Sequence, residues 1–211
     1  MHVIFIDGNE LRAAEIKLIV PVFELAVEPL QTGFATAAPD PETKARDKVL
    51  AHVVASACFA EAVDLQTIDG KSLRLELDSG NENRFCKWWR ETPAQMKLSV
   101  AMRQAGGTEI TIVAATCKGR IADKPAGPHF LGWDRLFVPD DQTLTLAELT
   151  KAGEVIEFRR VAYASVGLAL GGEDGGGRAL PDRRAEDGGG RALPDRRDED
   201  GGGRALPDRR D

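Results

Sequence analysis

Residues 118–150 carry the strongest signal in the sequence and read KGRIADKPAGPHFLGWDRLFVPDDQTLTLAELT. Residues 127–132 contain proline and two glycines, and Leu136–Val138 is apolar. Glycine and proline ahead of an apolar run predict a loop followed by a short strand. The segment 144–149 is short, and its secondary structure is ambiguous.

Outward from this stretch, strands and helices alternate along the chain. The apolar run Val3–Ile6 ends at Asp7-Gly8-Asn9, as a buried strand ending in a turn does. Asp69-Gly70-Lys71 joins two alternating segments, which predicts a hairpin. We expect strands at 3–6, 23–27, 62–68, 72–77, 109–115 and 136–138, and helices at 10–19, 42–60, 85–104 and 154–170.

This order predicts an α/β fold with a mixed, twisted central sheet flanked by helices. We expect one domain over residues 1–172. Residues 173–211 repeat a 13-residue unit three times, with three glycines and no aromatic residue in each unit. Such a segment buries too little apolar surface to offset its ordering entropy, so we expect a disordered tail.

Composition argues against several classes of protein. The 28 basic and 34 acidic side chains give a net charge of −6, which leaves no basic excess for a phosphate backbone, so nucleic-acid binding is not expected. No apolar run approaches the roughly 18–20 residues that span a bilayer. The three cysteines have neither disulfide nor zinc spacing, and no signal peptide is recognisable, so we expect a cytoplasmic protein.

Several segments resemble the inosine triphosphate pyrophosphatase family, in the same order. In residues 118–150 they are Gly119–Ile121, Pro125–Gly127, Leu131–Asp134, Phe137–Pro139 and Ala147–Leu149. Val3–Arg12 is similar to the family's opening strand and its Thr-Gly-Asn-x-x-Lys phosphate loop. The resemblance covers most of residues 1–165 and none of the tail.

The resemblance implies a Mg²⁺-dependent enzyme that hydrolyses a nucleoside triphosphate, such as a deaminated purine nucleotide, to the monophosphate and pyrophosphate. It also implies a homodimer. The phosphates would bind at a strand-to-helix turn, where backbone amides and a helix N-terminus favour anions. The implied substrate-binding residues at this turn and on the following helix are Asp7, Gly8, Asn9, Arg12 and Lys44, with direct binding of Mg²⁺ as the alternative for Asp7. The implied base-binding residues are Leu131, Gly132, Trp133, Asp134 and Arg160.

The family also uses an aspartate to hold Mg²⁺ and to orient the attacking water. Asp69 fits that position best by its spacing to Trp88, and we expect it to be both the catalytic residue and a metal ligand. Asp78 is the alternative. Glu28 lies close to the family's metal-binding glutamate, although Leu30 occupies the aligned position.

The chain also departs from the family pattern at both ends of the expected site. Asp7 replaces the loop threonine, Leu131 replaces the base-stacking aromatic residue, and Arg135 replaces a proline. Phe158-Arg159 stands where the family has Ser-His. Two hypotheses follow. The chain is an enzyme with an altered substrate, or it is a catalytically degenerate relative that acts in nucleotide binding or as a scaffold.

Overall fold

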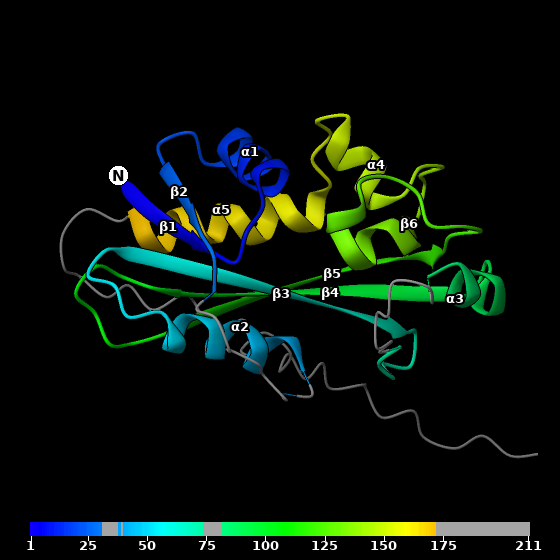
Figure 1. The fold of residues 1–211 in the computed structure, drawn as a ribbon, viewed down its shortest axis with the longest axis horizontal. Helices are drawn as coiled ribbons and strands as arrows, with labels where there is room; N and C mark the ends of the chain where they lie inside the picture. The colour runs from blue at the N-terminus through cyan, green and yellow to red at the C-terminus, as the bar shows by residue number, and fades with distance from the viewer. Residues whose placement is uncertain (31–37, 39, 74–81, 172–211) are drawn as a thin grey trace, which may run out of the picture. The chain divides into compact units, whose positions relative to one another are not determined.

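The computed structural model describes residues 1–30, 38, 40–73 and 82–171. Within these residues a six-stranded sheet has the order β2-β1-β3-β4-β5-β6 (Figure 1). The strands are β1 His2–Ile6, β2 Glu24–Glu28, β3 Ala57–Thr67, β4 Pro93–Arg103, β5 Thr111–Ile121 and β6 Phe137–Pro139.

The sheet is mixed, as predicted. β1 pairs in parallel with β2 and with the first residues of β3, whereas β3, β4, β5 and β6 pair antiparallel in succession. β1 pairs only with residues 57–60 of β3, so most of β3 extends beyond its parallel pairing with β1. The carboxyl ends of β1 and β2 therefore lie beside the middle of β3.

Side chains that alternate along β1 separate the two faces of the sheet. Val3 and Phe5 belong to one apolar core, and Ile4 and Ile6 to another. α1 (Glu10–Ile19) and α5 (Glu157–Gly171) cover the first face, and α2 (Pro41–Ala51) covers the second (Figure 1). This alternation follows from the two-residue period of a strand.

Short elements complete the chain around the C-terminal strands. α3 (Glu82–Trp89) precedes β4, and the 3₁₀ segment η1 (His129–Leu136) leads directly into β6. α4 (Leu146–Lys151) begins with a capping box formed by Thr145 and Glu148, which resolves the ambiguity of 144–149 as a helix. The closing helix predicted from residue 154 begins at Glu157.

The helix predicted over 42–60 is too long. α2 ends at Ala51, and Ala57–Ala60 belongs to β3. Cys58 and Phe59 lie fully buried between β1 and β4, where a sheet position removes more apolar surface from water than a helix end would. Tertiary burial therefore overrides the helical spacing at the end of this segment.

The helix predicted over 85–104 is wrong in its second half. α3 ends at Trp89, and an 11-residue strand, β4, begins at Pro93. Proline lacks the amide that a continuing helix needs. Apolar residues recur at every second position of β4, at Ala94, Met96, Leu98, Val100 and Met102, and all of them are buried, with Ser99 and Ala101 buried between them.

The predicted hairpin is present in part. Residues 62–68 fall largely in the second half of β3, and Ser72 forms an isolated bridge to Gln66. Residues 74–77 of the second strand lie outside the described residues, as do Asp78 and the repeats of 173–211. No helix in the described ranges is long and apolar enough to cross a membrane.

Candidate functional site

Three acidic residues lie where the parallel strands reach their carboxyl ends. Ile6 of β1 is opposite Glu28 of β2 and Ala60 of β3, so Asp7 and Glu61 each follow one residue later. In open α/β sheets, ligands bind beyond this edge. The turn that carries Asp7, Gly8 and Asn9 therefore lies at the expected place for a binding loop.

Asn9 and Gly8 have clear local roles in this turn. The Asn9 side chain accepts a hydrogen bond of 2.9 Å from the Arg12 amide and so caps α1. A Cβ atom on Gly8 would lie 2.8 Å from Cγ of Phe5, whose ring stacks on Phe59. Packing against this ring is sufficient to require glycine at position 8.

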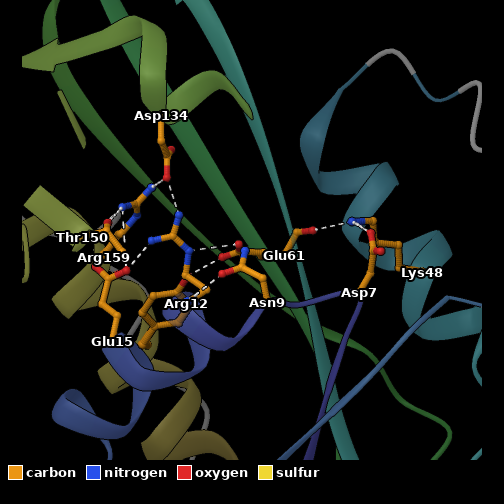
Figure 2. A network of polar contacts seen from close by, with 10 residues as sticks. Asp7, Asn9, Arg12, Glu15, Lys48, Glu61, Asp134, Thr150 and Arg159 are labelled. Atoms are coloured by element: carbon orange, nitrogen blue, oxygen red, sulfur yellow. Dashed lines mark hydrogen bonds and ion pairs between the residues drawn. The ribbon is translucent and has the colours of Figure 1, made fainter. Parts of the chain in front are cut away.

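Arg12 connects the turn to the rest of the molecule through a buried ionic network (Figure 2). Its guanidinium contacts the carboxylates of Glu15 and Asp134, and its Nε lies 3.3 Å from Oε1 of Glu61. Burial opposes the charge, but the surrounding carboxylates outweigh that effect and raise the pKa of Arg12. Arg12 is therefore a permanently charged link between α1, β3 and η1.

Asp134 receives a second guanidinium from α5. Arg159 Nη2 donates to Asp134 Oδ2 at 2.6 Å, and Arg159 Nη1 donates to Oγ1 of Thr150 at 3.1 Å. Burial alone would raise the pKa of Asp134, but Arg159 and Arg12 together hold it below its usual value. The carboxylate is thus ionised in a nearly solvent-free environment.

Glu61 completes the network on the side of the strand ends. Tyr163 of α5 donates its hydroxyl to Oε2 of Glu61, whose side chain keeps 19% of its surface exposed. Burial, followed by the nearby Glu61 charge, raises the pKa of Tyr163. Glu61 thus contacts the buried Arg12 and Tyr163 while its own side chain stays partly exposed.

Some polar atoms in the network have no hydrogen-bond partner in the described structure. They are Oδ1 of Asp134, Oε1 of Glu15 and Nε of Arg159, all buried. Buried polar atoms are normally satisfied. The network therefore has two acceptors and one donor that could each form a further hydrogen bond. They lie next to the loop predicted to bind the base.

That loop is η1, and its predicted residues take different positions. Leu131 is buried, whereas Gly132 has φ +51 and space around its Cα. Trp133 packs edge-on against Phe85 with ring centroids 5.9 Å apart. Arg135, in place of the family's proline, contacts Glu82 of α3 and so ties the loop to that helix.

The structure brings Asp134 together with Arg12 but leaves several other predicted residues apart from them. Asp69 is exposed on the turn after β3, where the hydroxyl of Thr67 donates to it and lowers its pKa. Thr67 is six residues beyond Glu61, roughly 20 Å along an extended strand. Arg160 is exposed and lies 3.3 Å from Glu157 on its own helix.

The remaining two predicted residues, Glu28 and Lys44, lie on β2 and α2. Glu28 Oε2 is 2.9 Å from Nε2 of His52. Lys44 is half-buried on α2, one helical turn before Lys48. Within the described ranges, no cluster of three or more His, Cys, Asp or Glu side chains is arranged to hold a metal ion.

Sequence reasoning missed Glu15, Glu61, Arg159 and Tyr163. Arg159 directly precedes the predicted Arg160, and an ungapped alignment cannot tell which neighbour faces inward. Burial of Ala162, Tyr163 and Val166 marks the inward face of α5, and Arg159 lies on it at i, i+3, i+4 and i+7 spacing. That spacing was the available signal.

Known proteins give an independent comparison. The sequence model of the Ham1 family matches residues 3–166. A dITP/XTP pyrophosphatase of Anaeromyxobacter sp. (strain Fw109-5) is 31% identical over 114 residues, which cover 51% of this chain and 48% of that protein. A dITP/XTP pyrophosphatase of Methanopyrus kandleri is 25% identical over 173 residues, which cover 71% of this chain and 85% of that protein.

The fold agrees with this comparison. The structure of the Staphylococcus aureus Ham1 protein superimposes with a TM-score of 0.57 at 19% identity and covers 82% of this chain and 100% of that chain. At this identity the likeness concerns the fold alone. The chain spans about half the length of the first of these curated relatives.

Proposed function

This chain belongs to the Ham1 family, and we propose from that membership that it is a nucleoside triphosphate pyrophosphatase. The proposed reaction is attack of water on the α-phosphorus, which releases a nucleoside monophosphate and pyrophosphate. The curated relatives are named dITP/XTP pyrophosphatases, which supports deaminated purine nucleotides as the substrate class. The resemblance further supports a homodimer, which size-exclusion chromatography with light scattering would test.

The contact between Arg12 and Asp134 is the observation that carries this proposal. It joins the turn predicted to bind phosphates to the loop predicted to bind the base, although 122 residues separate them in sequence. The two halves of a nucleotide site are thereby adjacent in the fold. Oδ1 of Asp134 has no hydrogen-bond partner among the described residues, but it is buried, so a donor on the base edge would reach it only after neighbouring side chains move aside.

Glu61 is the carboxylate best placed for the reaction at the phosphate end. It lies next to Asp7 at the edge of the sheet and contacts Arg12. A carboxylate there can accept a proton from the attacking water, which is general-base chemistry. Asp69 remains the prediction from sequence, and the two residues are best tested together.

The divalent-metal requirement also remains a prediction. The two residues predicted as ligands do not form a site together, because Glu28 lies beside His52 and Asp69 lies on the turn beyond β3. Since these two residues do not form a site together, we assign no step of the reaction to the ion.

Pyrophosphate release tests the proposed function. Full-length protein would be assayed with a panel of canonical and deaminated nucleoside triphosphates, with Mg²⁺ and with excess chelator. We expect selective turnover of ITP, dITP or XTP that disappears with the chelator. No turnover of any nucleotide by folded protein would overturn the proposal.

One observation favours a second candidate, a degenerate relative that keeps the fold for binding or assembly. Arg12 and Asp134 are both almost completely buried and satisfy each other's charge, as residues of a structural ion network do. Nucleotide binding without turnover, measured by calorimetry, would support this alternative.

A further inference from the structure

An ion pair at the sheet edge lies beside the buried network and touches it only at the Glu61 backbone. Lys48 Nζ is 2.7 Å from Oδ2 of Asp7, and it also donates to the backbone carbonyl of Glu61 at 3.1 Å (Figure 2). Lys48 comes from α2, Asp7 from the end of β1 and Glu61 from β3. The ammonium group therefore lies where the three elements meet.

We propose that Lys48 binds polyphosphate. Before the ligand arrives, the Asp7 carboxylate is paired with the Lys48 ammonium group, and the incoming polyphosphate must displace it. This inference rests on the proposed function and adds to it a phosphate-binding residue and a carboxylate that competes with the substrate. We call this competition between Asp7 and the polyphosphate for Lys48 the gate. The exchange is non-covalent: a phosphate oxygen takes the place of a carboxylate oxygen on the ammonium, and no bond is formed or broken.

The position of Lys48 is held by its surroundings. Ala45 and Val49 are fully buried and fix α2 on the sheet. Only 18% of the Lys48 side chain is exposed, and the Glu61 carbonyl holds its ammonium group. A lysine positioned before binding loses less side-chain entropy when it meets a ligand than a free surface lysine does.

The Asp7 carboxylate is free to leave because the turn does not need it. Asn9, not Asp7, caps α1. Asp7 has φ +56, a left-handed conformation that costs a non-glycine residue some energy and that Asp and Asn tolerate best. Its side chain is 43% exposed, so water can solvate the Asp7 carboxylate once it leaves Lys48.

The charges explain why such an occupant is useful. An uncompensated carboxylate in a phosphate-binding turn would repel the ligand. Paired with Lys48 it is neutralised, and a polyphosphate carries more negative charge with which to compete for the ammonium group. The gate therefore favours ligands with several phosphates over those with a single phosphate.

Calorimetric titration of inorganic tripolyphosphate into the full chain, at low salt and without divalent metal, tests the gate directly. We expect Asp7→Asn to bind about three- to tenfold more tightly than the unchanged protein, because one competing charge is removed. We expect Lys48→Met to bind about tenfold more weakly. The matched control is the pair between Glu42, on the same helix α2, and Lys97 of β4, which are 2.9 Å apart and half-exposed. We expect Glu42→Gln to leave the affinity for tripolyphosphate unchanged.

The double variant Asp7→Asn/Lys48→Met decides whether the two residues act on each other. The gate requires that Asp7→Asn does not raise the affinity for tripolyphosphate in a protein that already carries Lys48→Met. An undiminished gain in that background, or unchanged binding by Lys48→Met with an unchanged melting temperature, would overturn the proposal. Tripolyphosphate has no base and is not turned over, so this binding experiment is independent of nucleotide hydrolysis. The gate can therefore be confirmed in a protein that hydrolyses no nucleotide, and it can be overturned in a protein that does.

Discussion

At the scale of single residues, Asp134 is the centre of the buried network. Its carboxylate accepts from Arg159 and contacts Arg12, and the side chain is 1% exposed. Removing one partner from a buried ion network leaves the others uncompensated. We expect Asp134→Asn to lower the free energy of unfolding at neutral pH by about 3–5 kcal/mol, measured by urea titration. An unchanged unfolding midpoint would contradict the network.

The same residue predicts a dependence on pH. The two guanidiniums lower the pKa of Asp134 in the folded state, so its contribution is complete above the unfolded value of about 3.9 and is lost as the pH falls through the folded pKa. The stability of the unchanged protein should therefore fall more steeply below about pH 4 than that of Asp134→Asn. Parallel curves for the two proteins would contradict this assignment.

The sequence predicted which residues belong to the candidate site only where it carried a motif. Asp134 and Arg12 belong to motifs, and the structure brings them together. Arg159 stands where the family motif has a histidine, so the motif gave it no role, and it differs from Arg160 in the face of α5 on which it lies. Glu61 could not be found without the parallel pairing of β1 and β3, because its proximity to Asp7 depends on long-range register.

At the scale of elements, the pairing of β6 with β5 holds the η1 loop in place. Gly119 is opposite Pro139, and a Cβ atom there would lie 2.9 Å from Cα of Pro139 and closer still to the Val138 carbonyl. Because backbone cannot move aside cheaply, we expect Gly119→Ala to cost about 1–3 kcal/mol of stability. Gly171→Ala, with nothing within 4 Å, is the control and should be nearly neutral. Equal thermal stability of both variants would contradict this role for Gly119.

Elements were predictable where local signals and burial agreed. β1, α1 and β2 fall close to their predicted bounds because a turn or a proline marks each end. β4 was missed because its aromatic N-terminal neighbour, α3, has helical spacing, and we extended that pattern past Pro93. The start of β3 was missed because only burial between two strands distinguishes Ala57–Ala60 from a helix end.

At the scale of the whole molecule, Leu170, close to the end of α5, is the last buried core residue within the part of the chain that the structure describes. We propose that residues 1–172 form the complete domain and that the repeats of 173–211 do not contribute to it. Truncation after residue 172 should therefore change the free energy of unfolding by less than about 0.5 kcal/mol and leave pyrophosphate release unchanged. A large loss of either would show that the tail belongs to the folded unit.

We propose that the reaction takes place at the carboxyl edge of the parallel strands, beside Arg12 and Asp134. The most direct measurement compares the rate of pyrophosphate release by Glu61→Gln and Asp69→Asn, each assayed at a temperature well below its own melting temperature. We expect Glu61→Gln to lose about a hundredfold or more in kcat, as removal of a general base does, and Asp69→Asn to keep the original rate. Loss of activity in Asp69→Asn with full activity in Glu61→Gln would place the chemistry at the turn after β3 and contradict the account.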